Sequence, residues 1–264
     1  RYSNVIPNPE TRVPLGLKSS SASSCTTSHC ESEQYINANF VRGYLCAPKS
    51  YIATQAPMEH TREDFWQLAW EQQAQVILML TGLEENQVSR CCEYWPNTEG
   101  GDTVRVYGHY QVVQLKREVS PECIMSMLLL VNTRTGGKRE VAHFWLTAWP
   151  MNGLPDPKTV IQFLLEARPY MEDSLGPTIV HCSPGTGRTG TLIAVDIQMV
   201  SYDDTKIVDV LDCVTRLRQD RGGAVQSKEQ YIFIYKVLNE YARMLQSHNP
   251  SIASSMTSIN HLIT

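Results

Sequence analysis

The chain has 264 residues, of which 42% are hydrophobic and 19% charged, and its formal net charge at pH 7 is -4. Such a composition is ordinary for a globular protein, and the length suffices for one large domain with a sizeable core. We expect neither a transmembrane helix nor an N-terminal signal segment, and the absence of a basic stripe argues against nucleic acid as the main partner.

The first half of the chain predicts a loop, a helix and a run of strands. Residues 17–34 are rich in Ser, Thr and Cys, which is typical of an exposed loop. Residues 61–73 predict a helix that opens with Thr61 and Asp64 in capping-box spacing. The strands predicted after it cover residues 74–80, 103–118, 123–132 and 139–148, with a turn at 133–138.

Helices dominate the second half of the chain. We expect Asp156 to cap a helix that starts at Pro157 and ends at Pro169, because proline suits the first turn of a helix and disrupts later turns. Further helices are predicted over residues 191–200, 205–219 and 227–245, and an apolar strand is predicted over 177–180.

Two of these helices have clear local signals. Ile207 and Leu211 lie on the apolar face predicted for the helix over 205–219. Ser227 and Gln230 have capping-box spacing at the start of the helix over 227–245.

Strands that alternate with helices early and helices that dominate late predict an α/β fold. We expect a single domain, residues 1–246, with a central twisted mixed sheet flanked by helices. A short polar tail, residues 247–264, is expected to be loosely ordered.

The eight cysteines show no C-x-x-C pair and no regular spacing, which favours free thiols in a reducing compartment. "CTTSHC" contains Cys25, His29 and Cys30, half of a tetrahedral zinc site, but no second ligand pair with fitting spacing follows. We therefore expect no metal ion. The domain is expected in the cytoplasm, where it could also form the intracellular part of a membrane receptor.

The stretch "HCSPGTGRTG", residues 181–190, stands between the apolar strand and the apolar helix. Gly185 and Gly187 let the backbone turn tightly, so that successive N–H groups can converge on an anion beside the positive end of the helix. A cysteine among such donors is favoured in its thiolate form, which makes Cys182 a candidate nucleophile.

The other polar residues of this loop suit phosphoryl transfer. Arg188 can place its planar guanidinium over the equatorial oxygens of a bound phosphoryl group. Attack by sulfur on phosphorus would give a phosphocysteine that water hydrolyses. Ser183 and Thr189 could donate hydroxyl hydrogen bonds to the sulfur, while His181 is expected to order the loop rather than act as a base.

Two other interpretations of the loop are weaker. Most cysteines are inert core residues, and Cys182 alone would be read as one. A nucleotide-binding loop of the Walker type requires a lysine that "GTGRTG" lacks. The combination of a cysteine, two glycines, an arginine and a threonine between strand and helix favours the phosphate site.

Over about residues 1–246 the chain resembles the protein-tyrosine phosphatase family. The resemblance rests on "RYSNVIPNPETRVPL", "YINANFVRGY", "YIATQAP", "CCEYWP", "HCSPGTGRTG" and "VQSKEQY". Two segments, "RGGAVQ" and "IPNPETRV", are also similar to the phosphatases that act on MAP kinases. "TQAP" departs from the family in having Ala56 where glycine is usual.

The resemblance implies a role for each matching residue, with a phosphotyrosine-bearing protein as substrate and no organic cofactor. Tyr2 would wall the pocket and stack on the substrate ring, and Asn4 would hold the substrate backbone. Glu85 would orient Arg188, and the two glutamines would position the hydrolytic water. The residues implied for these glutamines and for the phosphate-binding loop are Gln226, Gln230, Pro184, Gly185, Thr186 and Gly187.

One departure from the family is serious. The family has an Asp after Trp-Pro that protonates the leaving phenolate, and "TAWPMNGLPD" has Met151 at this position. A thioether donates no proton, and general acid catalysis is typically worth about 10²–10⁴-fold. We interpret Asp156, five residues later, as the helix cap rather than as a substitute acid.

Three hypotheses follow from this departure. The first is an active phosphatase slowed by the loss of its acid, since the nucleophile and the hydrolytic glutamines are present. The second is a pseudophosphatase that binds phosphotyrosine proteins without turnover. The third is that Met151 was introduced to trap substrates, which a single sequence does not separate from a native methionine.

Overall fold

The computed structural model describes residues 1–16, 35–97, 101–151 and 153–248. The loop predicted at 17–34, with its Cys25, His29 and Cys30, lies outside the described residues, as does most of the predicted tail.

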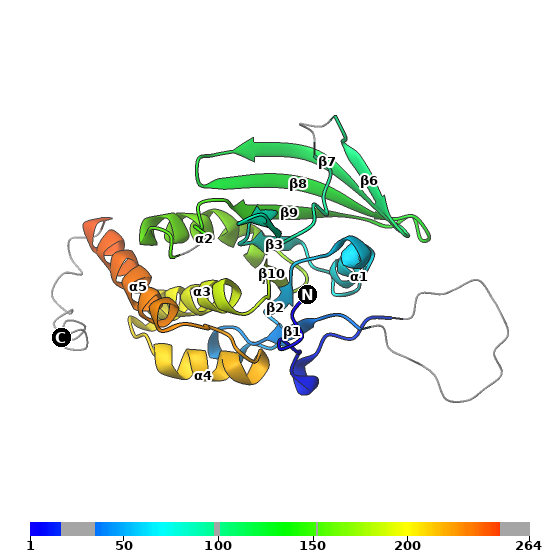
Figure 1. The fold of residues 1–264 in the computed structure, drawn as a ribbon. Helices are drawn as coiled ribbons and strands as arrows, with labels where there is room; N and C mark the ends of the chain where they lie inside the picture. The colour runs from blue at the N-terminus through cyan, green and yellow to red at the C-terminus, as the bar shows by residue number, and fades with distance from the viewer. Residues whose placement is uncertain (17–34, 98–100, 152, 249–264) are drawn as a thin grey trace.

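A single mixed sheet of eight strands forms the centre of an α/β domain, as predicted (Figure 1). Its four central strands are parallel, and antiparallel strands extend it on both sides. In spatial order the strands are β1 (Ala38–Val41), β2 (Tyr51–Gln55), β10 (Thr178–Cys182), β3 (Val76–Met79), β9 (Lys138–Leu146), β8 (Cys123–Asn132), β7 (Tyr110–Val119) and β6 (Val104–Tyr107).

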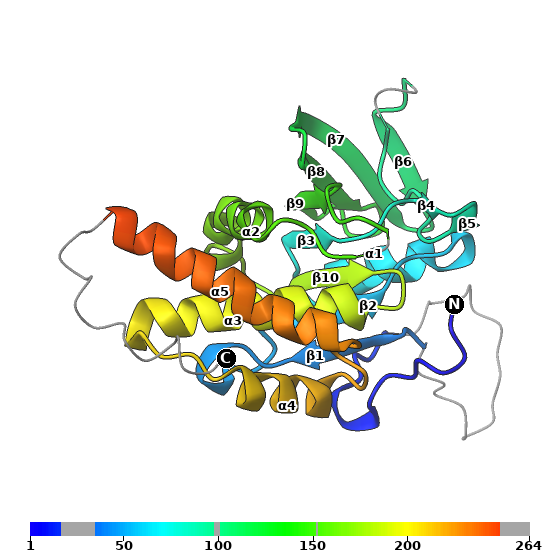
Figure 2. The ribbon, with the colours of Figure 1, turned by 60° about the vertical axis from the view of Figure 1, so that its left-hand side comes forward.

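Helices cover both faces of this sheet (Figures 1 and 2). One face packs against α1 (Arg62–Glu71), and the other against α2 (Pro157–Glu172), α3 (Gly187–Thr205), α4 (Val210–Asp220) and α5 (Lys228–His248). The remaining elements are the short helices η1 (Pro9–Thr11), η2 (Tyr44–Cys46) and η3 (Glu59–Thr61) and a separate hairpin of β4 (Glu84–Glu85) and β5 (Val88–Ser89). Within the described residues, no helix is long and apolar enough to cross a membrane.

Strand β3 shows how the two cores are built. Its side chains alternate in direction, and all four are buried. Val76 and Leu78 belong to the core beneath α2 and α3, whereas Ile77 and Met79 belong to the core beneath α1. A strand covered on both faces must be apolar throughout, which is why this stretch shows no alternation of apolar and polar residues.

Two predicted boundaries in the first half are wrong. Residues 103–118 form two strands rather than one, because Gly108 adopts a φ of 57° and turns the chain between β6 and β7. Thr61 does not cap α1 with its side chain; its Oγ1 accepts a hydrogen bond from the backbone N–H of Met58 instead.

The second half also departs from prediction at two points. Helix α2 continues past Pro169 to Glu172, so this proline does not end the helix as predicted. The predicted helix over 205–219 starts only at Val210, because α3 runs to Thr205 and Lys206 then adopts a left-handed conformation. Ile207, which precedes the helix, and Leu211, in its first turn, are both exposed rather than buried.

The caps predicted at two helices are confirmed. The Asp156 side chain accepts a hydrogen bond from the backbone N–H of Lys158 at 2.9 Å, so it caps α2. Ser227 Oγ accepts from Gln230 N–H at 3.2 Å, and Gln230 Oε1 accepts from Ser227 N–H at 3.4 Å, which completes a capping box at the start of α5.

A polar network, buried at Asp196 and more exposed at Asp203, joins the helical layer to the sheet. Arg168 on α2 contacts Asp196 at 3.0 Å and Asp203 at 3.1 Å, both on α3. Tyr51 on β2 donates a hydrogen bond to Asp196 at 2.6 Å, and Tyr241 on α5 donates to Asp203 at 2.7 Å. Burial and the Asp196 carboxylate raise the pKa of Tyr51 well above its ordinary value, so its hydroxyl remains a donor.

We predict that Tyr51→Phe lowers the free energy of unfolding by about 2 kcal/mol, because it leaves a buried carboxylate without one of its donors. Urea unfolding measures the loss. Tyr44→Phe is the matched control, since Tyr44 donates to Asp204 at an exposed site and its loss should stay within about 0.5 kcal/mol. An equal loss of unfolding free energy in the two variants would contradict the prediction that the buried hydrogen bond of Tyr51 stabilises the fold more than the exposed one of Tyr44.

Candidate active site

The loop between β10 and α3 is built around Gly185. Cys182 is the last residue of β10 and Gly187 the first of α3, so the nucleophile candidate lies between strand and helix as predicted. Gly185 adopts a φ of 73°, and a Cβ there would lie 2.1 Å from the backbone oxygen of Thr54. Only glycine fits this turn.

Arg221 supports the loop from inside the protein. Its side chain is fully buried and donates to the backbone oxygens of Gly185 and Pro184, both at 3.1 Å. It also donates to the Oδ1 atoms of Asn37 at 2.7 Å and Asn39 at 2.9 Å. Burial lowers the pKa of Arg221 to about 10, so the guanidinium is still charged at neutral pH. Sequence reasoning missed this residue, since nothing in "RGGA" indicates a buried arginine.

A pocket of about 220 Å³ opens over the loop. It is lined by Tyr2, Thr81, Glu85, Arg90, Cys182, Ser183, Pro184, Gly187, Arg188, Gln226 and Gln230. Nine of these residues are candidates that the sequence identified, and they come from segments spread over the whole chain. Thr81 and Arg90 are additions.

Arg188 is held by groups from three segments. Its Nη1 donates to Glu85 Oε1 at 2.6 Å and to the backbone oxygen of Leu80 at 2.9 Å. Its Nη2 donates to the backbone oxygens of Pro150 at 3.3 Å and Met151 at 3.1 Å. The pairing of Glu85 with Arg188 is therefore present, and the guanidinium is fixed at the wall of the pocket.

Met151 contributes its backbone rather than its side chain. The side chain is 37% exposed and is not among the groups lining the pocket. Trp149, two residues earlier, is buried and packs against Phe233 of α5 at a ring distance of 6.2 Å. The segment is thus anchored at Trp149 and at Arg188, with no carboxyl group at position 151.

Tyr2, Ser183 and Arg90 form a closed ring of hydrogen bonds beside the nucleophile candidate. Arg90 Nη1 donates to the Tyr2 hydroxyl at 3.0 Å, which lies 3.0 Å from Ser183 Oγ. Ser183 Oγ donates in turn to the backbone oxygen of Arg90 at 3.1 Å. The hydroxyl hydrogen of Ser183 is directed to Arg90 in this arrangement, and its expected donation to the sulfur of Cys182 stays a prediction.

The two glutamines lie over the start of α3. A Cβ on Gly187 would come within 2.8 Å of Gln226 Oε1 and 3.0 Å of Gln230 Nε2, so glycine lets both amides approach the loop. Gln230 Oε1 also accepts from the backbone N–H of Gln226 at 2.9 Å. This bond and the capping box fix the orientation of Gln230, which leaves its NH₂ group directed toward the loop.

His181 belongs to a buried cluster behind the loop. The Tyr94 hydroxyl lies 2.7 Å from His181 Nε2 and 2.8 Å from His143 Nε2, and His181 Nδ1 lies 3.4 Å from the backbone oxygen of Cys182. Burial lowers the pKa of both histidines to about 3. A neutral, hydrogen-bonded His181 agrees with an ordering function better than with that of a base.

The remaining candidates do not line the pocket. The hydroxyl groups of Thr186 and Thr189 are both buried, and neither has a hydrogen-bond partner among the described residues. Gly185 and Thr186 are not among the residues that line the pocket, and neither is Asn4, which is exposed.

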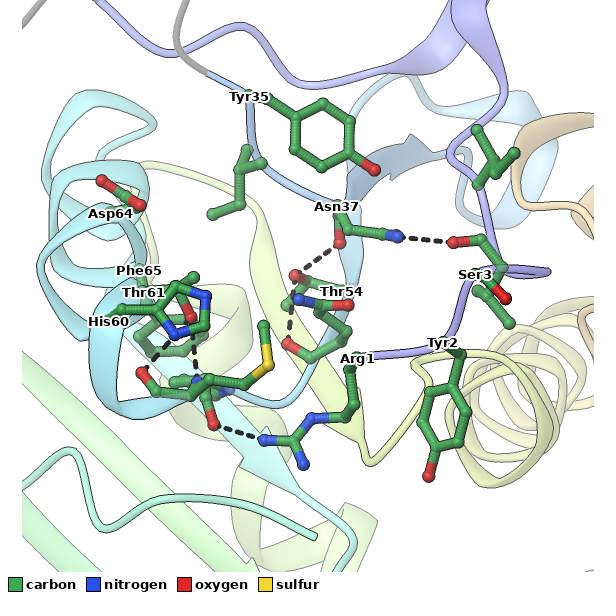
Figure 3. A pocket seen from close by; sticks show the side chains of 16 residues that line it. Arg1, Tyr2, Ser3, Tyr35, Asn37, Thr54, His60, Thr61, Asp64 and Phe65 are labelled. Atoms are coloured by element: carbon green, nitrogen blue, oxygen red, sulfur yellow. Dashed lines mark hydrogen bonds between the residues drawn. The ribbon is translucent and has the colours of Figure 1, made fainter.

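A second cavity, of about 300 Å³, lies on the other side of Arg1 (Figure 3). Arg1 donates to the backbone oxygens of Pro57 at 2.8 Å and Ser89 at 3.1 Å, and Tyr2 lines both this cavity and the smaller pocket. Neither Cys182 nor Arg188 lines it. We therefore place the chemistry in the smaller pocket, which contains both.

Comparison with known proteins agrees with the resemblance seen in the sequence. The family described as "Protein-tyrosine phosphatase" matches residues 1–240. The chain is 38% identical over 254 residues to human receptor-type tyrosine-protein phosphatase R, an alignment that covers 94% of this chain and 36% of that protein. It is 37% identical over 248 residues to human tyrosine-protein phosphatase non-receptor type 7, covering 93% of this chain and 64% of that protein.

A third relative is the tyrosine-protein phosphatase Lar-like of Caenorhabditis elegans, 40% identical over 238 residues, or 89% of this chain and 10% of that protein. The chain thus spans about a third of the length of receptor-type phosphatase R and less of the Lar-like protein.

We predict that the buried histidines make the fold sensitive to mild acid. The unfolded chain protonates them below about pH 6.5, whereas the folded chain keeps them neutral down to about pH 3. The unfolded state then binds more protons, so stability falls as the pH drops through this window. Between pH 7 and 5 the loss should be about 2 kcal/mol for each histidine.

Urea unfolding at several pH values tests this, with His143→Asn as the variant. Its stability should fall by about 2 kcal/mol less than that of the natural chain between pH 7 and 5. His60→Asn, at an exposed position, is the control. A pH dependence that is the same in all three proteins would contradict the prediction.

Proposed function

The chain belongs to the protein-tyrosine phosphatase family, and we propose that it hydrolyses phosphotyrosine through a phosphocysteine intermediate, with Cys182 as nucleophile. The observation that carries this proposal is the convergence of Cys182, Arg188, Glu85 and two glutamines on one pocket over the loop between β10 and α3. If these residues were isolated polar groups, nothing would explain why Glu85 and Arg188, which lie 103 positions apart in the chain, meet at this pocket.

In the first step the Cys182 sulfur attacks phosphorus while the bond to the phenolate oxygen breaks. Arg188 binds the equatorial oxygens, and its orientation is fixed beforehand by Glu85 and Leu80. Backbone N–H groups of the loop from Ser183 to Gly187 and the positive end of α3 supply the rest of the anion binding. Such preorganised donors stabilise the charge of the transition state without rearranging.

In the second step water attacks the phosphocysteine. Gln226 and Gln230 face the loop across Gly187 and are placed to orient that water. Thr189, whose buried hydroxyl has no other partner among the described residues, is the remaining candidate to donate a hydrogen bond to the departing sulfur. His181 keeps the loop ordered from behind through Tyr94 and the Cys182 backbone.

Tyr2 makes the pocket selective for a long, aromatic phosphate ester. Its hydroxyl lies 3.0 Å from the Oγ of Ser183, the neighbour of the nucleophile, so its ring forms a wall of the pocket that reaches down to the loop. A phosphotyrosine can lie along this wall, whereas phosphoserine is too short to bring its phosphorus to the sulfur. We assign the exposed Asn4 to the substrate backbone.

Met151 supports a second candidate function. Because position 151 has no proton donor and Asp156 caps α2, the leaving phenolate receives no help from a carboxylic acid at either position. A domain in which this step is too slow would act as a pseudophosphatase that retains phosphotyrosine proteins. Retention of both hydrolytic glutamines favours the slowed enzyme.

The proposal includes the bounds of the domain and its cellular compartment. We assign residues 1–246 to the phosphatase domain and 247–264 to a tail. We place the domain in the cytoplasm, free or attached to a membrane receptor, since the relatives include receptor-type and non-receptor phosphatases.

We predict that Cys182→Ser abolishes phosphate release from p-nitrophenyl phosphate, by at least about 10³-fold, because a hydroxyl at this site is a far weaker nucleophile than a thiolate. Cys46→Ser, at an exposed thiol on η2, is the control and should keep full activity. Two outcomes would contradict the enzyme proposal. One is phosphate release that persists in Cys182→Ser. The other is that the unsubstituted chain releases no phosphate but binds phosphotyrosine peptide tightly.

We predict that Met151→Asp raises turnover of a phosphotyrosine peptide by about 10²-fold or more, because it restores a general acid. Met151→Asn is the matched control, since it has nearly the same shape without an acidic proton. An equal effect of both substitutions, or none from Asp, would show that the missing proton does not limit the rate.

A further inference from the structure

We propose that Arg90 stabilises the negative charge that develops on the leaving phenolate oxygen, the charge that no acid at position 151 neutralises. This inference rests on the proposed function and assigns to Arg90 a direct part in the first chemical step. It concerns a residue that the sequence did not single out and that lines the same pocket as Cys182 and Arg188.

The position of Arg90 follows from its hydrogen bonds. Its Nη1 donates to the hydroxyl of Tyr2 at 3.0 Å, and that hydroxyl is 3.0 Å from Ser183, the neighbour of the nucleophile. A guanidinium bonded to this hydroxyl lies at the depth of the reacting atoms rather than at the rim of the pocket.

The acidic group nearest to Arg90 does not fully neutralise its guanidinium charge. Glu85 lies 2.6 Å from Arg188, with both side chains largely buried, but its nearest oxygen is 3.8 Å from Arg90 Nε. That distance is too long for a hydrogen bond, and Arg90 Nε has no hydrogen-bond partner among the described residues. Glu85 thus pairs closely with Arg188 and forms a longer ion pair with Arg90, so one carboxylate faces two guanidinium groups and leaves part of their positive charge uncompensated at the pocket.

The backbone around Arg90 fixes its position in advance. Glu85 ends β4 and Arg90 directly follows β5; the turn residues between these strands, Asn86 and Gln87, both have positive φ, as a tight two-residue turn requires. The Arg90 N–H donates to Leu83 at 2.8 Å, and its carbonyl accepts from Ser183. A cation held in this way stabilises charge without reorganising.

The step balances without a carboxylic acid. The thiolate pair of Cys182 forms the S–P bond, and the pair of the breaking P–O bond stays on the phenolate oxygen. Arg90 offsets the charge of that phenolate while it departs, and solvent water supplies its proton afterwards. The pocket thus replaces proton transfer by electrostatic stabilisation.

The test measures kcat/KM for a series of aryl phosphates whose phenols range from acidic, as in p-nitrophenyl phosphate, to weakly acidic, as in phosphotyrosine. In Arg90→Met the loss should grow as the phenol becomes less acidic, reaching about 10²-fold for phosphotyrosine. Arg90→Lys, which keeps a charge, should show a smaller dependence on the leaving group. Arg216→Met, which removes a surface arginine of α4, is the control for net charge and should show none.

The alternative is that Arg90 only holds Tyr2 in place. Arg90→Met would then lose the same factor on every ester, and Tyr2→Phe would reproduce its profile; either result overturns the inference while leaving the phosphatase proposal intact. A second measurement uses Met151→Asp, in which the phenolate is protonated as it leaves. The loss caused by Arg90→Met on phosphotyrosine should shrink in that background, and an unchanged loss there would also overturn the inference. Inactivity of the natural chain on every ester would overturn both proposals.

Discussion

The buried guanidinium of Arg221 is the interaction on which the site depends. A loop whose N–H groups point at an anion must turn its carbonyl oxygens the other way, into the protein, where they need donors. Arg221 supplies these donors to Pro184 and Gly185 and ties them to Asn37 and Asn39 beside the sheet. The geometry of the proposed anion site is therefore set from beneath the loop, by a buried residue that does not line the pocket.

Most of the fold could be predicted from the sequence because its signals are local. The capping residues Asp156 and Ser227 marked the starts of α2 and α5 correctly, and the glycines of "HCSPGTGRTG" marked the turn between β10 and α3. The helix end predicted at Pro169 was wrong, since a single missing N–H near the end of a well-packed helix is tolerated when the apolar face continues beyond it.

Part of the site could not be predicted, because its residues act through long-range contacts. Arg90 lies 88 residues from Tyr2, and Tyr94 lies 87 residues from His181, so no spacing in the sequence joins them. The bond from Ser183 to the backbone oxygen of Arg90 was not predicted for the same reason, because the two residues lie 93 positions apart.

The contact between Arg188 and the segment at 150–151 involves only main-chain oxygens. A change of side chain at position 151 therefore removes none of the hydrogen bonds that hold Arg188. In the mechanism proposed above, affinity for phosphotyrosine and turnover are then separately adjustable, because position 151 sets the supply of a proton while Arg188 keeps its place.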